Sequence, residues 1–202
     1  MASIIFIIEH LEPEVSKWLL FEYMHASEIV GKEKLWFTNV KRIEDFQKLK
    51  TLGRVCLERA FELFPPFKVI VLDPKANLSL KPNDFEGKEA VIIGGILGDH
   101  PPKGRTSKLL TATLPGAIVR NIGKVQFSID GAIYVAKLVS EGTPLEAISV
   151  KRGLRIKFDN KGEIYLPYAY PIKNGKPLIN PKLIEYLCSE EILEDEEKML
   201  RN

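Results

Sequence analysis

Residues 91–107 hold the side chains best suited to chemistry in this 202-residue chain. An apolar β-type run gives way to two glycines, and Asp99, His100 and Arg105 follow shortly afterwards. A strand that ends in glycines and then in charged groups is typical of a ligand site in an α/β sheet. Asp99 could orient a substrate, His100 could accept a proton and Arg105 could hold an anionic group. The alternative is that Asp99 and His100 only make hydrogen bonds that shape the loop and that Arg105 is solvated.

The glycine spacing excludes two common phosphate-binding motifs. A dinucleotide fingerprint needs G-x-G-x-x-G, whereas Gly94, Gly95 and Gly98 have another spacing. A P-loop needs four residues between its glycines and then Lys, but five residues separate Gly98 from Gly104, and arginine follows. Two of those residues are prolines, which have no N–H to donate to phosphate. We therefore exclude ATP hydrolysis. The remaining hypothesis is a ligand site at a strand end, where glycines let the backbone approach the ligand closely.

Other carboxylates could complete such a site. Glu9 and His10 end the first apolar run, so we expect both to point into the same cleft as Asp99. Glu22 falls within the apolar stripe of the first predicted helix, where a carboxylate is expected to be paired or functional. A structural ion pair with Lys or Arg is an equally weighted alternative for Glu22. Glu12 is a further candidate.

The apolar pattern predicts the elements that must position these residues. Short continuous apolar runs are typical of buried parallel strands, which we predict at 3–8, 35–37, 67–72, 89–93 and 117–119. We predict helices from Pro13 to a terminal glycine at position 31, and over 43–50, 55–64 and 129–140. The alternation indicates an α/β fold, with a mostly parallel sheet and helices on both of its faces.

A second strand end also leads into a helix. The Asn-Ile-Gly sequence at 121–123 ends the strand, and a short loop precedes the buried helix predicted at 129–140. Ser128 is suited to cap that helix, and Asp130 lies in its first turn, where the helix dipole favours an anion. Capping alone would explain both residues. A second ligand loop is the functional alternative.

The last quarter of the chain has a different pattern. Two stretches, 154–158 and 163–166, flank a D-N-K-G turn signal and predict a β-hairpin. A final helix is predicted to begin near Pro181. We therefore divide the chain into a main domain, 1–150, and a hairpin-and-helix appendage, 151–202, packed on it.

The composition of the chain indicates where in the cell the protein is located. A net charge of +2, with 45% hydrophobic and 28% charged residues, is typical of a soluble globular protein. No apolar run is long enough to cross a bilayer, and no basic segment precedes the first apolar run. Cys56 and Cys188 are far apart, which favours reduced thiols and neither a disulfide nor a zinc site. We expect a cytoplasmic protein without a membrane partner or a bound metal.

Several of these segments together resemble a known superfamily. GGILGDHPP at 94–102 and IGKVQFSIDGAI at 122–133 resemble the SPOUT superfamily of S-adenosylmethionine-dependent methyltransferases. IIEHLEPEVSKWLLFEYMHASEIVG at 7–31 and LDPKANLSLKPNDF at 72–85 resemble its archaeal and eukaryotic subfamily described as RNA methyltransferases. The fungal member of that subfamily methylates arginine in a small-subunit ribosomal protein. The resemblance covers about two-thirds of the chain and carries no motif after position 150.

The resemblance implies a fold and a cofactor. The C-terminal part of the parallel sheet would be threaded into a deep trefoil knot, which is otherwise nearly absent from proteins. S-adenosylmethionine would lie in the knot, and members are often dimers, so we expect a monomer or a homodimer. The residues implied to bind the cofactor are Leu72, Asp73, Gly94, Gly95, Ile96, Leu97, Gly98, Asp99, Asn121, Ile122, Gly123, Val125, Gln126 and Ser128.

The resemblance also implies methyl transfer to a macromolecule of the translation machinery, either an arginine of a ribosomal protein or RNA. Such a displacement needs a positioned nucleophile, and a guanidinium, whose pKa exceeds about 12, needs a carboxylate as proton acceptor. The catalytic candidates are Glu9, His10, Glu22, Asp99, His100 and Arg105. Weak net charge and an acidic C-terminal tail slightly favour a basic protein over RNA. The rival hypothesis is a non-catalytic ribosome-assembly module that binds S-adenosylmethionine or a nucleotide.

Overall fold

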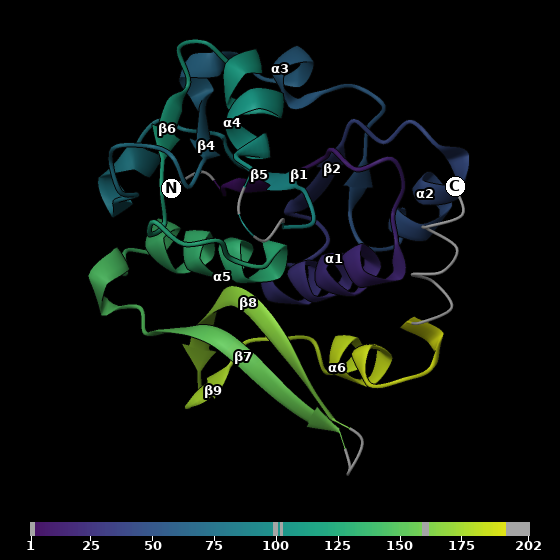
Figure 1. The fold of residues 1–202 in the computed structure, drawn as a ribbon. Helices are drawn as coiled ribbons and strands as arrows, with labels where there is room; N and C mark the ends of the chain where they lie inside the picture. The colour runs from purple at the N-terminus through teal and green to yellow at the C-terminus, as the bar shows by residue number, and fades with distance from the viewer. Residues whose placement is uncertain (1–2, 99–100, 102, 159–161, 193–202) are drawn as a thin grey trace.

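A six-stranded parallel sheet forms the centre of the computed structural model, which describes residues 3–98, 101, 103–158 and 162–192. Its strand order is β3-β2-β1-β5-β4-β6 (Figure 1). The strands are β1 (Ile5–His10), β2 (Leu35–Thr38), β3 (Arg54–Val55), β4 (Val69–Leu72), β5 (Ala90–Gly95) and β6 (Ile118–Arg120). Every pairing within this sheet is parallel, which confirms the sequence-based prediction.

Helices cover both faces of the sheet. The helices that follow or separate its strands are α1 (Lys17–Val30), α2 (Ile43–Leu49), α3 (Ala60–Leu63), α4 (Arg105–Leu109) and α5 (Ile129–Ser140), with 3-10 turns η1 (Pro66–Lys68), η2 (Pro82–Phe85), η3 (Thr111–Thr113) and η4 (Leu145–Ala147). Strand side chains alternate between two cores. Phe6 and Ile8 pack on the α1 and α5 side, whereas Ile7 packs with Ala60 of α3 on the other. In Figure 1, α1 and α5 lie below the sheet and α3 and α4 above it.

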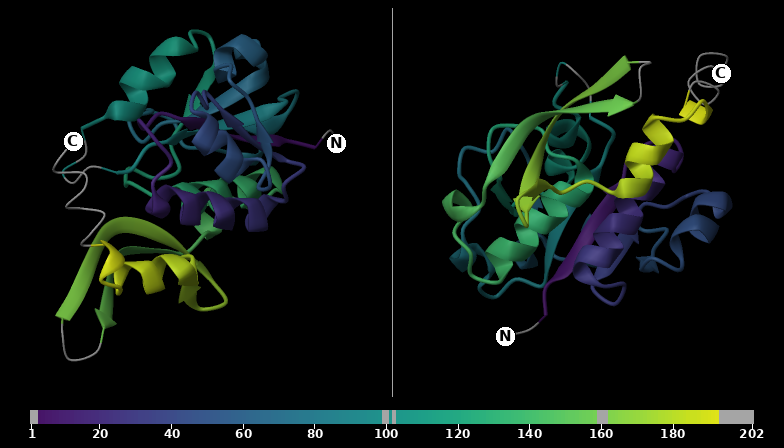
Figure 2. Two further views of the ribbon diagram at one scale, coloured as in Figure 1. Left: turned by 90° about the vertical axis from the view of Figure 1, so that its right-hand side faces the viewer. Right: turned by 90° about the horizontal axis from the view of Figure 1, so that it is seen from below.

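A second, antiparallel sheet packs outside α1 and α5 (Figure 2). It contains β7 (Val150–Phe158), β8 (Gly162–Lys173) and β9 (Lys176–Pro177), and α6 (Pro181–Leu187) follows it. Trp18 and Phe21 of α1 share an apolar cluster with Leu183 and Leu187 of α6. The predicted hairpin and the helix start at Pro181 are confirmed, while the turn residues 159–161 lie outside the described residues.

Two predicted element boundaries are wrong. The first helix begins at Lys17 rather than Pro13, because the Ser16 side chain caps it by accepting a hydrogen bond from the Leu19 N–H. Residues 55–64 are not one helix, because Val55 pairs with β2 as the end of β3 and only Ala60–Leu63 is helical. The second error arises because a local pattern competes with strand pairing to distant residues.

Both cysteines are free in the structure, and Cys56 is buried. In the described part of the chain, no helix is both long enough and apolar enough to cross a membrane.

Candidate functional site

A cavity of about 310 Å³ lies at the carboxyl ends of β4 and β5, beside the start of α5. Its walls come from the end of β4 and the loop after it, from β5 with residues 103–106, and from the loop between β6 and α5. Among the residues predicted to bind a cofactor, those that line this large cavity are Leu72, Asp73, Gly94, Ile96, Ile122, Val125, Gln126 and Ser128. The structure therefore brings together the three loops that were expected to meet, and their contact with a cofactor stays a prediction.

A second, smaller cavity of about 10 Å³ adjoins the large one. Glu22 lines it, and we call it the Glu22 slot; the described residues that line it are Trp18, Glu22, Ile96, Leu97, Gly98, Phe127, Ser128, Ile129 and Tyr168. Ile96 and Ser128 belong to both linings. A group bound at Glu22 would therefore lie next to a ligand of the large cavity.

The two glycines that end β5 face opposite sides of the sheet. A Cβ added at Gly94 would meet the Ile96 side chain at 3.3 Å on the cavity side. A Cβ added at Gly95 would lie 2.4 Å from the Tyr23 hydroxyl and 2.9 Å from Ile8. Gly95 is thus required by the packing of α1 against β1. It lies outside the lining that the described residues give the large cavity.

Asp73 and Asn121 hold loops around the cavity. Asp73 is buried, and its Oδ2 accepts hydrogen bonds from the Ser107 and Thr111 hydroxyls, each at 2.7 Å. Asn121 donates to the Ala76 carbonyl at 2.9 Å, while its Oδ1 accepts from the backbone N–H of Gly123. Asp73 thereby joins the segment after β5 to the end of β4. Asn121 and Gly123 are outside the linings formed by the described residues.

Glu22 is the carboxylate that the structure places in the slot beside the large cavity, whereas Asp73 lines the large cavity itself. Only 4% of the residue is exposed. Its Oε1 accepts a hydrogen bond from the Trp18 indole N–H at 2.7 Å, and its Oε2 accepts from the Ile129 backbone N–H at 2.8 Å. Burial raises the pKa of Glu22 to about 8, and the Asp130 carboxylate contributes in the same direction. Among the described residues no Lys or Arg pairs with Glu22, so the structural ion pair is not formed there.

Asp130 and His25 join α5 to α1 next to this carboxylate. The Nδ1 atom of His25 lies 2.6 Å from the Oδ2 atom of Asp130, which is 1% exposed. His25 is therefore a half-buried partner of Asp130 and not a solvated surface side chain. Ser128 caps α5 as predicted, since its Oγ accepts from the Gly131 N–H at 3.3 Å. Ser128 also lines both cavities, so it is placed to contact a ligand as well as to cap the helix.

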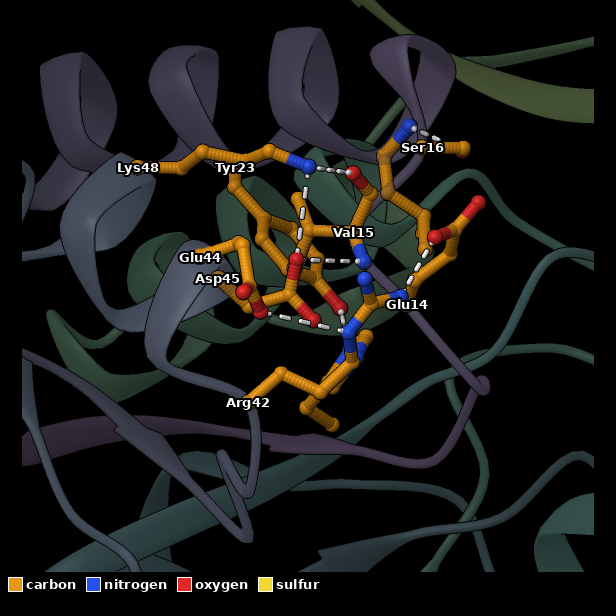
Figure 3. Close-up of polar contacts among 10 residues, drawn as sticks. Glu14, Val15, Ser16, Tyr23, Arg42, Glu44, Asp45 and Lys48 are labelled. Carbon is orange, nitrogen blue, oxygen red and sulfur yellow. Dashed lines mark hydrogen bonds and ion pairs between the residues drawn. The ribbon is translucent and has the colours of Figure 1, made fainter.

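Helix α2 fixes the loop that leads into α1, as Figure 3 shows. Asp45 is buried and accepts a hydrogen bond from the Val15 N–H at 3.1 Å. Lys48 donates to the Val15 carbonyl at 2.7 Å and pairs with Asp45 at 3.3 Å. These bonds meet one residue before Ser16, the cap of α1. They hold the first turn of the helix, and with it Trp18, against the rest of the domain.

Glu9 and His10 lie on opposite faces of β1, because successive strand residues alternate. Glu9 faces α3, where its carboxylate accepts from Arg59 at 2.6 Å, from the Ala60 N–H at 2.8 Å and from the Thr38 hydroxyl at 2.5 Å. His10 faces α1; its Nδ1 lies 3.1 Å from the Tyr23 hydroxyl, and burial lowers its pKa. Neither residue lines the large cavity or the Glu22 slot as the described residues form them. A catalytic role for either stays a prediction.

Arg105 lines the large cavity and also holds the glycine loop. Its guanidinium donates to Glu12 Oε1 at 2.9 Å and to the Leu97 carbonyl. The Leu97 N–H donates to the same Glu12 oxygen at 2.8 Å. Arg105 is therefore not a solvated loop residue. Asp99 and His100 lie outside the described residues, so their predicted roles stay predictions.

Sequence reasoning did not identify several residues at the site. Trp18 precedes Glu22 by one helical turn, so the i, i+4 spacing could have revealed it. Lys75 follows the end of β4 closely, and Lys103 and Lys124 add further cations to the cavity wall. Tyr168 had no local signal, because it comes from β8 of the second sheet.

The fold and the site define a class of protein, an α/β protein with a cavity at the carboxyl edge of a parallel sheet, where α/β proteins usually bind ligands. The dual-specific Trm10 protein of Thermococcus kodakaraensis shares this fold. Its solved structure has a TM-score of 0.55 at 19% identity, covering 71% of this chain and 96% of that chain.

Residues 5–193 match the family described as "Protein arginine N-methyltransferase SFM1-like", and the chain belongs to this family. SFM1 of Saccharomyces cerevisiae is 31% identical over 212 residues, covering 90% of this chain and 93% of the yeast protein. The yeast enzyme complexed with SAM has a TM-score of 0.84 at 29% identity, covering 95% and 92% of the two chains. Its complex with SAH has a TM-score of 0.82 and covers 92% and 94%.

Family membership confirms the resemblance and the expected methyltransferase activity. The ligands of the yeast enzyme agree with the cofactor expected from the sequence. The match extends through the second sheet to residue 193, whereas the sequence motifs had not reached beyond position 150.

Proposed function

We propose that this protein transfers the methyl group of S-adenosylmethionine to an arginine of a protein substrate. The observation that carries the proposal is the buried Glu22 carboxylate in a slot that adjoins the large cavity. Each carboxylate oxygen accepts one N–H and keeps a second lone pair. Two such oxygens match the planar fork of a guanidinium, which donates two parallel hydrogen bonds.

The large cavity suits the cofactor. Its volume of about 310 Å³ lies within the usual range for small-molecule sites. Leu72, Ile122 and Ala132 offer apolar walls, while Lys75 and Lys124 offer cations for a carboxylate such as that of the methionine part. Gly94 lets the backbone approach closely. We also propose that the chain forms the trefoil knot of the SPOUT fold around this cavity, with the family assignment as support.

The chemistry assigned to Glu22 is acceptance of a proton. S-adenosylmethionine, when bound, supplies an electrophilic methyl group on a sulfonium. A guanidinium nitrogen forms the new N–C bond as the C–S bond breaks, and a nitrogen proton passes to the Glu22 carboxylate. With its pKa raised to about 8, Glu22 is mostly protonated at pH 7 while the slot is empty. A cationic guanidinium in the slot favours the ionised form, so substrate binding creates the base.

We propose that the substrate is a ribosomal protein rather than RNA. We also propose that the protein acts in the cytoplasm. A cation stabilises the ionised Glu22 carboxylate whereas phosphate would destabilise it, and the chain's net charge is only +2. The two free cysteines support a reducing compartment.

The test is methyl transfer from radiolabelled S-adenosylmethionine to salt-washed ribosomal subunits. We expect label that protease removes and nuclease does not, and methylarginine after acid hydrolysis. Nuclease-sensitive label would identify RNA as the substrate instead. Calorimetry with S-adenosylmethionine completes the test, because binding without any transfer would favour a non-catalytic assembly module.

A further inference from the structure

We propose that Tyr168 of β8 is a specificity-determining residue, whose ring forms the movable wall of the Glu22 slot and stacks on the arginine guanidinium. The proposal rests on the arginine transfer proposed above and deepens it. It gives the second sheet a part in the active site, since Tyr168 of β8 is among the described residues that line the slot.

The backbone of β8 is attached directly to the cofactor side of the site. The Ala169 N–H donates to the Gln126 carbonyl at 2.8 Å, and Ala169 forms a parallel bridge with Phe127. Gln126 lines the large cavity, and Phe127 lines both cavities. Tyr168, the preceding residue of β8, is therefore held at the slot by the loop that enters α5.

The ring of Tyr168 forms one wall of the slot in this structure. Its hydroxyl donates to the Gly98 carbonyl at 2.8 Å. A Cβ added at Gly98 would lie 2.5 Å from the Tyr168 Cε1 atom, so glycine is what permits this contact. The ring stands at 87° to that of Trp18, with centroids 6.5 Å apart. Trp18 in turn holds Glu22, so an aromatic corner and a carboxylate border the same space.

The slot must widen before a guanidinium can enter. Its volume of about 10 Å³ is close to the least that holds one water. Glu22 and Ile129 are buried in packed helices, whereas Tyr168 is half-buried on a separate sheet. Trp18 and Leu97 are half-buried walls as well, and among these walls we assign the movement to the tyrosine ring, which can turn about its side-chain bonds while β8 stays attached. Its movement breaks the hydrogen bond to Gly98 and exposes a ring face to the entering cation.

An aromatic face beside a carboxylate selects for a planar cation. The ring quadrupole attracts a guanidinium above its face, and the carboxylate receives the fork of N–H donors. Loss of the ring should weaken acceptor binding about tenfold while the cofactor site is unaffected. The expected signature is a change in KM for the acceptor and little change in kcat.

The experiment compares Tyr168→Phe and Tyr168→Leu with the wild-type protein, because both variants keep most of the side-chain bulk. Initial rates are measured with radiolabelled S-adenosylmethionine and salt-washed ribosomal subunits. We expect Leu to raise the acceptor KM about tenfold and Phe to raise it less than about threefold. Calorimetry should give a Kd for S-adenosylmethionine within about twofold of the wild-type value in both variants. Tyr165→Ala, at an exposed residue of the same strand, is the matched control and should behave as wild type.

Equal acceptor KM values for the Leu and Phe variants would overturn the proposal, because the aromatic face would then have no part in binding. A loss of cofactor affinity in both variants at unchanged acceptor KM would also overturn it, and would assign Tyr168 to the Gly98 loop instead. Failure of the proposed function is a separate result: the wild-type protein would transfer no methyl group to arginine.

Discussion

The indole N–H of Trp18 donates to the Oε1 atom of Glu22 across 2.7 Å, one turn apart on α1. The backbone N–H of Ile129 holds the other oxygen at 2.8 Å. Both donors belong to packed helices, so the direction of the carboxylate is fixed before any substrate arrives. Burying this acid without a cationic partner among the described residues costs folding free energy. A role in ligand binding would explain why the acid is there.

Glu22→Gln should abolish arginine methylation. The amide cannot accept the guanidinium proton, so we expect the transfer rate to fall at least about 100-fold. Calorimetry should show that S-adenosylmethionine still binds, because Glu22 is outside the lining of the large cavity. Glu28→Gln, at an exposed position of the same helix, is the control. Full activity in a folded Glu22→Gln protein would remove Glu22 from the mechanism.

The rate should depend on pH through Glu22. Because burial and Asp130 raise its pKa to about 8, the ionised form in the free enzyme increases as pH rises. The profile of kcat/KM for the acceptor should therefore rise with an apparent pKa near 8. Asp130→Asn removes a nearby negative charge and should move the rising limb to lower pH. A rate independent of pH between 6 and 9 would contradict the assignment.

Protein stability provides a second measure of the same group. Unfolded Glu22 ionises near pH 4.3, whereas the folded side chain stays protonated up to about pH 8. Between these values the folded state binds more protons, so this contribution to stability falls as pH rises. Thermal unfolding should show the wild-type protein losing stability relative to Glu22→Gln from pH 5 to 8. A constant difference would mean that the pKa is not raised.

Gly94→Ala and Gly95→Ala should have different effects although the residues are adjacent. A methyl group at Gly95 would meet Tyr23 and Ile8 in the core and should cost about 1–3 kcal/mol of unfolding free energy. A methyl group at Gly94 meets only the Ile96 side chain closely and projects on the cavity side, so it should mainly weaken cofactor binding. Chemical denaturation and calorimetry separate the two effects. Equal losses of stability would contradict the opposite facing of the two glycines.

Arg105→Ala should weaken cofactor binding through the Leu97 loop. The guanidinium bonds to Glu12 and to the Leu97 carbonyl, and a charge-assisted bond of this kind corresponds to roughly tenfold in affinity. We expect the Kd of S-adenosylmethionine to rise about tenfold by calorimetry. Lys108→Ala, at an exposed site on the same helix, should leave it unchanged. An unchanged Kd for Arg105→Ala would show that the loop holds its shape without the arginine.

Local pattern was sufficient for much of the fold. The helix predicted at 129–140 is α5, with the Ser128 cap where it was expected, because apolar periodicity and capping chemistry depend on neighbouring residues. The local pattern fails over 55–64 because the structure there depends on a distant partner: Val55 pairs with β2, which comes earlier in the chain. Sequence also marked Glu22, because a carboxylate inside an apolar stripe is conspicuous without any knowledge of its partner.

The sequence by itself determined the parallel α/β class, the loops that meet at the cavity and the superfamily resemblance. Each of these depends on the residue pattern of short contiguous segments. Only the tertiary structure decided which of the catalytic candidates Glu9 and Glu22 stands beside the cavity. The Ile129 N–H that orients Glu22 is 107 residues away, and Tyr168 reaches the slot from another sheet. Glu9 lies at an equally suggestive strand end, yet alternation along β1 turns it towards Arg59. Contacts between distant segments have no local signature, because they depend on how whole elements pack.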